Sequence, residues 1–152
     1  MAHLFAPRIP DPELPVMFNV DGVVGANPAQ NLREDVLLVQ FAFEILAKEP
    51  LPTTPPEVLA AAKAVRPTGM IDKATINAIF VLQGALGNPA TVVDGRVSPV
   101  KGGYSYGSAM WTIVHLNNFM QNRHVDVWPR IDKIQGCPSE LKQMVIRTVA
   151  GV

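Results

Sequence analysis

The residue types best suited to ligand binding gather around one glycine-rich segment of the chain. Tyr104 and Tyr106 lie within this segment, Trp111 follows it, and Arg96 precedes it. Flat aromatic faces stack on sugars or on partner side chains, and a guanidinium binds carboxylates through two parallel hydrogen bonds. We therefore predict a ligand-binding surface formed by Arg96, Tyr104, Tyr106 and Trp111. A structural role in the core is the alternative for Trp111 and for both tyrosines.

Residues that could perform catalysis or bind a metal are sparse. His115, His124 and Cys137 are the closest group of such side chains, and their spacing matches no recognised metal-binding pattern. Nothing around Cys137 indicates a lowered thiol pKa or an oriented base, so nucleophilic catalysis is not favoured. We interpret the three as a half-buried helix histidine, a surface histidine and a core thiol. The sequence accordingly predicts a protein without metal, cofactor or enzymatic activity.

The acidic residues that stand out have structural explanations. Glu34 and Asp35 come at the start of a predicted helix, where the helix dipole favours negative charge. Asp21 and Asp94 each precede a glycine, and Asp-Gly is a turn-forming pair. The glycine pair 102–103 lacks the flanking residues of a Walker or Rossmann phosphate-binding loop. None of these features indicates an active site.

The length and composition of the chain predict one domain with a sizeable core. The chain has 152 residues, of which 48% are hydrophobic and 17% are charged, so a single packed core is expected. Thirteen basic and thirteen acidic residues cancel, which argues against nucleic-acid binding. Apolar runs such as residues 36–43 are too short to span a bilayer, because spanning takes about 20 residues. With a single cysteine, no internal disulfide can form.

The N-terminal segment is rich in proline and lacks the features of a secretion signal. Because residues 1–8 contain no basic region followed by an apolar run, we expect a protein that is cytoplasmic as synthesised, or one exported by a route that reads no cleaved signal. Four prolines predict an extended arm over residues 1–19. Its apolar residues Leu14, Val16 and Phe18 cover either the domain's own core or that of a second copy. In the second case the arm would support a homo-oligomer.

Residues 20–152 are predicted to form one compact, mainly α domain of about five helices with short hairpin-like hooks. Asn31 with Glu34 resembles a capping box, and Thr54 and Asp72 are candidate N-caps. A helix that is apolar on nearly all sides should lie at the centre of the domain. This central helix is predicted over residues 32–48. The others are predicted over 54–65, as an insertion, from 72 to Gly84 or Gly87, over 108–122, and from 138 to the glycine at 151.

Two Asp-Gly turns occur in the domain, at residues 20–25 and at residues 93–97. We call them the first hook and the second hook. Each precedes a helix that carries an amide side chain, Gln40 in one case and Asn117 in the other. A duplication of a hook followed by a helix explains this repetition, and so does the chance recurrence of a common turn.

Three sequence phrases follow one another in a characteristic order. They are Asp35-Val36-x-x-Val39-Gln40, then Gly69-x-x-Asp72-x-x-Thr75-x-x-Ala78-Ile79-x-x-Leu82-Gln83, then Val93-Asp94-Gly95-Arg96-Val97-Ser98-Pro99. This order, over roughly residues 20–117, resembles the peptidoglycan-binding-like domain family, in which a three-helix module carries similar phrases. The chain departs from the family pattern in an insertion at 49–68, in Leu82, where the family has an aromatic residue, and in Ser98, where it has glycine.

The resemblance implies a peptidoglycan-binding-like core and a non-catalytic binding module for glycan-peptide of the bacterial cell wall. Family members often accompany cell-wall hydrolases and hold the substrate near the catalytic partner. The alternative is a role in protein–protein interaction, as a structural subunit of a bacterial or phage assembly such as a secretion or tail-like apparatus. The expected partner is therefore a peptidoglycan fragment or a protein. Neither nucleic acid nor a membrane is expected.

Overall fold

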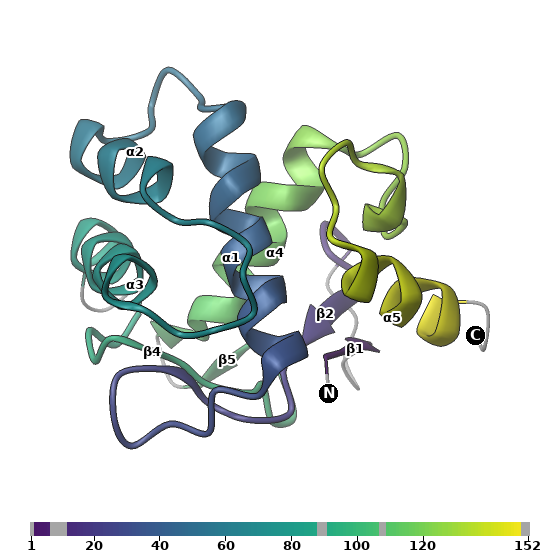
Figure 1. The fold of residues 1–152 in the computed structure, drawn as a ribbon, viewed down its shortest axis with the longest axis horizontal. Helices are drawn as coiled ribbons and strands as arrows, with labels where there is room; N and C mark the ends of the chain where they lie inside the picture. The colour runs from purple at the N-terminus through teal and green to yellow at the C-terminus, as the bar shows by residue number, and fades with distance from the viewer. Residues whose placement is uncertain (1, 7–11, 88–90, 107–108, 150–152) are drawn as a thin grey trace.

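Helices dominate the part of the chain that the computed structural model describes, which is residues 2–6, 12–87, 91–106 and 109–149. This confirms the predicted mainly α class. Figure 1 shows α1 through the middle of the molecule, with α2 and α3 on one side and α5 on the other. The described helices are α1 (Arg33–Lys48), α2 (Pro56–Lys63), α3 (Lys73–Leu86), α4 (Thr112–Arg123), α5 (Ser139–Val149) and the 3₁₀ turn η1 (Ile131–Lys133).

The central helix of the fold is α1, as its apolar composition predicts. Every residue from 35 to 43 is buried, and α1 packs against α2, α4 and α5. Burying one large apolar side chain contributes about 1.5–3 kcal/mol to stability. The fully enclosed Phe41 and Phe43 therefore make α1 the main contributor to the core. Helices α2, α4 and α5 pack directly on α1, α3 packs on α2, and η1 packs on α5.

Three small antiparallel strand pairs tie the loops to this helical frame. Each pair is two or three residues long and forms no larger sheet within the described residues. The pairs are β1 (His3–Phe5) with β2 (Met17–Asn19), β3 (Val24–Gly25) with β4 (Arg96–Val97), and β5 (Ser105–Tyr106) with β6 (Ala109–Met110).

The described part of the N-terminal arm packs on its own domain. Leu14 and Phe18 are enclosed in the core. The edge of the Trp128 ring meets Phe18, with ring centroids 5.7 Å apart and planes at 83°, and the Trp128 indole donates a hydrogen bond to the Val16 carbonyl at 3.2 Å. These apolar residues therefore cover the chain's own core. The extended conformation predicted for Pro7 and Pro10 lies outside the described residues.

The first and second hooks pair with each other across most of the sequence. Val24 faces Val97, and Gly25 faces Arg96; these valines occupy equivalent positions in the two hooks. The backbones approach so closely that a Cβ on Gly25 would lie 2.2 Å from the Gly95 carbonyl oxygen. Gly25 has φ +128° and Gly95 has φ +71°, conformations that glycine adopts without strain. The Asp-Gly turns thus join two distant parts of the chain instead of forming separate local hairpins.

Buried amide side chains fasten helices to neighbouring backbone. Asn117 of α4 accepts a hydrogen bond from the Phe18 N–H and donates one to the Phe18 carbonyl, both at 2.8 Å. Gln40 of α1 accepts from the Gly69 N–H at 2.9 Å and donates to the Met70 carbonyl at 3.0 Å. Each amide satisfies a donor and an acceptor that burial would otherwise leave unpaired. Gln40 therefore fixes the backbone of residues 69–70 to α1.

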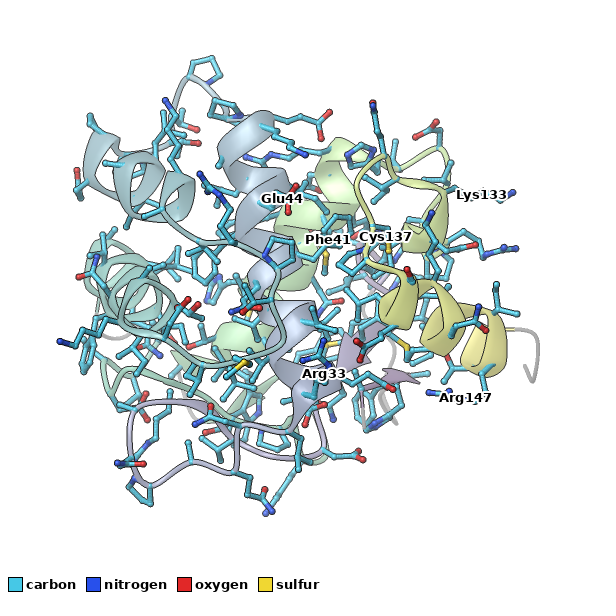
Figure 2. All side chains as sticks on the ribbon, in the orientation of Figure 1. Arg33, Phe41, Glu44, Lys133, Cys137 and Arg147 are labelled. Atoms are coloured by element: carbon cyan, nitrogen blue, oxygen red, sulfur yellow. The ribbon has the colours of Figure 1, made fainter. Side chains whose placement is uncertain are left out.

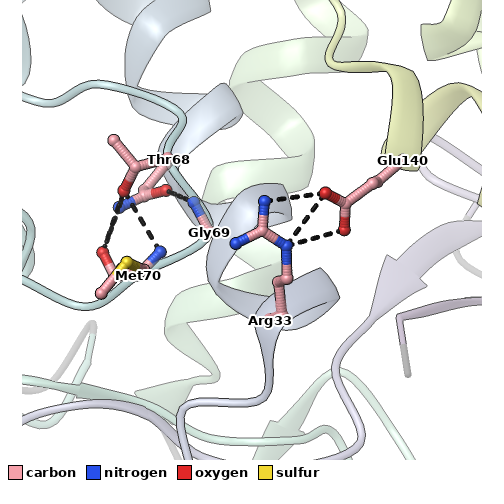
Figure 3. A network of polar contacts seen from close by, with 6 residues as sticks. Arg33, Thr68, Gly69, Met70 and Glu140 are labelled. Atoms are coloured by element: carbon pink, nitrogen blue, oxygen red, sulfur yellow. Dashed lines mark hydrogen bonds and ion pairs between the residues drawn. The ribbon is translucent and has the colours of Figure 1, made fainter.

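A surface ion pair covers the outside of the Gln40 contact. Figure 3 shows the Arg33 guanidinium between the loop at Gly69 and the carboxylate of Glu140 on α5. Arg33 Nε donates to both Glu140 oxygens at 2.9 Å, and Nη2 donates to one of them at 2.8 Å. This hydrogen bonding is the first cause that raises the pKa of Arg33 and lowers the pKa of Glu140. The pair links the start of α1 to α5.

Of the three predicted N-caps, only Asp72 caps a helix in the structure. Asp72 caps α3 as predicted, because its Oδ1 accepts from the Thr75 N–H at 2.8 Å. The capping box at Asn31 is wrong: Asn31 has φ +50° and bonds to both polar backbone groups of Gly25, which leaves Leu32 as the N-cap of α1. Thr54 is not a cap either, since its hydroxyl accepts from the Leu51 N–H and Pro55 is the N-cap of α2.

Among the remaining helix ends, the start of the fourth predicted helix differs from the structure. Helix α4 begins at Thr112 and not near residue 108, because Ala109 and Met110 are paired in β6. Helix α3 ends at Leu86, and Gly87 is its C-cap, with φ +72° and its N–H donating to the Gln83 carbonyl. This confirms Gly87, the second of the two predicted stops. The predicted end of α5 at residue 151 lies outside the described residues.

Candidate functional site

A shallow hollow lies between the second hook and the start of α4. Its volume is about 190 Å³. This space fits a single sugar ring or side chain and is smaller than the sites that bind drug-sized molecules. We call it the Arg96 hollow. It combines a guanidinium, a carboxylate, two hydroxyls and an indole. The lining residues are Val92, Asp94, Arg96, Ser98, Trp111 and Thr112.

The base of the Arg96 hollow is held by one fully buried amide, Gln83 near the end of α3. Its carbonyl oxygen accepts from the Asp94 N–H at 3.1 Å and from the Gly95 N–H at 2.8 Å. Its amide nitrogen lies within 3.2 Å of Asp94 Oδ1, 2.9 Å of the Arg96 carbonyl and 3.0 Å of Thr112 Oγ1. One side chain therefore fixes the second hook against the first turn of α4.

The charged pair in the hollow is loosely joined. Arg96 Nε lies 3.7 Å from Asp94 Oδ2, and the Arg96 side chain is 32% exposed. Asp94 Oδ1 accepts from the Arg96 N–H at 3.0 Å, so the carboxylate is fixed to the backbone of the hook. A distance of 3.7 Å is too long for a hydrogen bond. The guanidinium therefore keeps hydrogen-bonding capacity that an incoming carboxylate or hydroxyl can use.

Trp111 forms the opposite side of the hollow. It is the N-cap residue of α4, and its backbone N–H donates to the Tyr104 carbonyl at 3.2 Å. The following residue, Thr112, bonds through its hydroxyl to Gln83 and to Thr91. These contacts place the half-buried indole of Trp111 next to the second hook. The structure brings together Arg96 and Trp111, two of the four predicted site residues.

The two predicted tyrosines are not part of the described hollow. Tyr104 is 8% exposed and belongs to the core, where its ring lies 6.4 Å from that of Phe5 at an angle of 45°. Its ring therefore has the core role that the sequence left open. Tyr106 contributes its backbone to β5, and its side chain lies outside the described residues.

Three exposed apolar residues belong to the hollow or to the second hook beside it. Val92, which lines the hollow, and its sequence neighbour Val93 both expose nearly half of their surface, and so does Phe80 of α3. The Phe80 ring lies on Gly95, where a Cβ would come within 2.3 Å of it. The lining residues Val92, Asp94, Ser98 and Thr112 were missing from the sequence prediction. In the sequence, Asp94 is fully explained as a turn residue. Its hydrogen bonds to Gln83 and to the Arg96 N–H give no signal there.

No family model, no curated protein and no solved structure matches the chain. Over the described ranges, no helix has the length and apolarity needed to cross a bilayer. The same ranges contain no group of three or more histidine, cysteine, aspartate or glutamate side chains arranged to hold a metal ion.

A second and larger hollow, of about 420 Å³, lies between the C-terminal half of α1, the end of α4 and the segment after η1. We call it the Glu44 hollow. Two ion pairs lie within it, Lys48 with Glu44 at 2.6 Å and His124 with Glu49 at 2.5 Å. Figure 2 shows Glu44 and Phe41 on α1 close to the segment that carries Cys137. The lining residues are Phe41, Glu44, Ile45, Lys48, Glu49, His124, Ile134, Gln135 and Gly136.

Each of the three residues considered for catalysis has its own structural environment. Burial, the largest cause, raises the pKa of the Cys137 thiol to about 12, so the thiol is protonated at neutral pH and a poor nucleophile. His115 is half-buried on α4, and His124 caps the end of α4 beside Glu49. Cys137 is a core thiol, as expected from the sequence.

Proposed function

We propose that the chain is a non-catalytic binding module whose ligand occupies the Arg96 hollow. The observation that carries this proposal is the meeting of Arg96 and Trp111 over a base fixed by the buried Gln83. A site held by buried hydrogen bonds loses little conformational entropy when it binds a ligand. The hollow is therefore suited to recognition without requiring a conformational change.

The chemistry of the hollow favours a sugar that carries an acidic group. The indole of Trp111 offers an apolar face for a sugar ring, and Asp94 and Ser98 offer acceptors and a donor for its hydroxyls. Arg96 is the group that would bind a carboxylate. Cell-wall glycan-peptide combines these features, and the resemblance of the sequence phrases to peptidoglycan-binding-like domains supports the same ligand class.

Exposed apolar residues near the hollow favour a protein partner as the second candidate. Val92 lines the hollow, Val93 follows it in the sequence, and Phe80 lies on Gly95 of the second hook, and exposed apolar surface is typical of protein interaction sites. A partner side chain that carries a carboxylate would use Arg96 in the same way. This reading corresponds to a structural subunit of a larger assembly, and a homo-oligomer remains one form of it.

Co-sedimentation with insoluble peptidoglycan tests the first candidate. We expect the protein to pellet with the glycan and Arg96→Ala to bind about tenfold more weakly, because a hydrogen-bonded charge is lost. Lys63→Ala, a change to an exposed cation on α2, should bind like the unmodified protein. If the unmodified protein stays in the supernatant, the wall-binding proposal fails and the protein-partner candidate is left.

A further inference from the structure

A third hollow lies where the ends of four helices meet. It is bordered by the end of α1, the segment that leads into α2, the end of α3 and the end of α4. Helix α1 packs on α2 and on α4, and α2 packs on α3. The volume of this hollow is about 170 Å³. We call it the Phe119 hollow, and its lining residues are Leu46, Leu51, Thr53, Thr54, Pro55, Val58, Leu82, Ala85, Leu86, Phe119 and Arg123.

Most of the lining of the Phe119 hollow is apolar. Leu46, Val58 and Leu82 are buried and belong to the hydrophobic core, whereas Leu51 is 48% exposed. An apolar cavity of about 150 Å³ is large enough to bind benzene. The hollow therefore has room for an apolar body the size of one benzene ring. Such a body gains free energy by leaving water, at about 25 cal/mol per Å² of apolar surface buried.

Arg123 carries the only charge among the described residues that line this hollow. Its guanidinium lies over the Phe119 ring, with Cζ 5.8 Å from the ring centroid. Nε donates to the Glu49 backbone carbonyl, and Nη1 donates to the Phe119 carbonyl at 3.0 Å. A guanidinium has five N–H donors, and Nη2 has no hydrogen-bond partner within the described ranges. Arg123 thus brings unused donors to the edge of an apolar hollow.

The positive charge of Arg123 is only partly compensated by the protein. In the part of the chain that the structure describes, no carboxylate forms an ion pair with the guanidinium; the Glu49 carboxylate contacts His124 Nε2 at 2.5 Å instead. Burial is the first cause that lowers the pKa of Arg123, and the charge of Glu49 offsets this effect only in part. An anion placed against the guanidinium would offset the rest and accept charge-assisted hydrogen bonds.

From this arrangement we propose that the Phe119 hollow binds a small apolar carboxylic acid in its ionised form, with a body about the size of one benzene ring. The carboxylate accepts hydrogen bonds from the unused donors of Arg123, and the body lies on Leu46 and Leu82. The Thr54 hydroxyl already accepts from a backbone N–H, so its own proton is a further donor in the lining. The Phe119 and Arg96 hollows share no lining residue, and this site stands independently of the proposed function.

Titration of the ¹⁵N-labelled protein with benzoate tests this site. We expect saturable shifts of the amide signals of Leu51, Leu86 and Phe119, with a dissociation constant in the millimolar range expected for so small a probe. Benzylamine has the same ring and the opposite charge, and acetate has the charge without the ring, so both should cause much smaller shifts. Equal shifts with benzylamine would overturn the proposal. So would benzoate shifts confined to residues 94–98, which would place the acid in the Arg96 hollow, or the absence of saturable shifts.

A change of charge tests the role of the guanidinium. Arg123→Gln should weaken benzoate binding about tenfold, because it removes charge-assisted hydrogen bonds to the carboxylate. Arg147→Gln is the matched control: Arg147 lies on α5, its side chain is 48% exposed, and it does not line the hollow. This variant should bind benzoate like the unmodified protein. Unchanged affinity in Arg123→Gln would contradict the proposed position of the carboxylate.

A change of volume tests the same site without altering Arg123. Ala85 is an exposed residue of α3 that lines the hollow, so Ala85→Leu places three more carbon atoms in the space of the ligand and should weaken benzoate binding at least tenfold. Ala60→Leu makes the same change at an exposed position of α2 outside the hollow and should leave binding unchanged. If Arg123→Gln does not fold, the Ala85 variant decides. Full benzoate affinity in Ala85→Leu would overturn the proposal.

Discussion

Replacing Gly25 by alanine is expected to lower the free energy of unfolding by at least about 3 kcal/mol. Two independent effects add. A side chain at φ +128° is strained by about 1–3 kcal/mol, and the new Cβ would lie 2.2 Å from the Gly95 carbonyl oxygen, so the paired hooks must separate. Separation removes the contact between Val24 and Val97. Urea unfolding followed by circular dichroism measures the change.

Gly84→Ala is the matched control for this prediction. Gly84 lies inside α3, where an added Cβ meets no atom within 4 Å. Alanine is favoured over glycine in a helix by about 1 kcal/mol, so this variant should be more stable than the unmodified protein. The same chemical change is thus expected to have opposite signs at the two positions. If Gly25→Ala were as stable as the unmodified protein, the close pairing of the hooks would be wrong.

Gln83→Leu should destabilise the protein by about 3–5 kcal/mol, because it leaves several buried groups without partners and each costs about 1–3 kcal/mol. The Asp94 and Gly95 N–H groups lose their acceptor, and the Arg96 carbonyl loses a donor. Leucine fills a similar volume, so the effect reports hydrogen bonding and not a cavity. Urea unfolding provides the measurement.

Gln143→Leu controls for the exchange of an amide for an apolar side chain. Gln143 is an exposed residue of α5, where surface substitutions usually change stability by no more than about 0.5 kcal/mol. Similar effects for the two variants would show that Gln83 does not hold the second hook. In that case the Arg96 hollow would lose the base on which its proposed ligand binding depends.

Local features of the fold were predictable from the sequence because they depend on neighbouring residues. Asp72 and Thr75 are three residues apart, and their hydrogen bond caps α3 as their types indicate. The apolar composition of α1 likewise predicts its central position. Asn31 carries the same kind of cap signal but bonds to Gly25 instead. A competing hydrogen bond to a residue six positions earlier therefore overrode the capping preference of Asn31.

Long-range contacts account for what the sequence could not predict about the candidate site. Arg96 and Trp111 meet because Gln83 bonds to both the second hook and Thr112, and a helix pattern does not reveal which loop a buried glutamine contacts. Tyr104 has the same aromatic character as Trp111 but faces Phe5 in the core. The Glu44 hollow was missed for a similar reason. The spacing of Glu44 and Lys48 is visible in the sequence, whereas the approach of His124 and Gly136 is not.

The indole signals of the two tryptophans test the central claim, that the Arg96 hollow is the ligand site, most directly. In a ¹H–¹⁵N spectrum each indole gives one signal, and a Trp128→Phe variant assigns them. On titration with a soluble disaccharide-peptide released from peptidoglycan, we expect a saturable shift of the Trp111 indole. The Trp128 indole, which donates to the Val16 carbonyl, should stay in place. A bound ligand that leaves the Trp111 signal unmoved, or the absence of any shift, would contradict the assignment of the site.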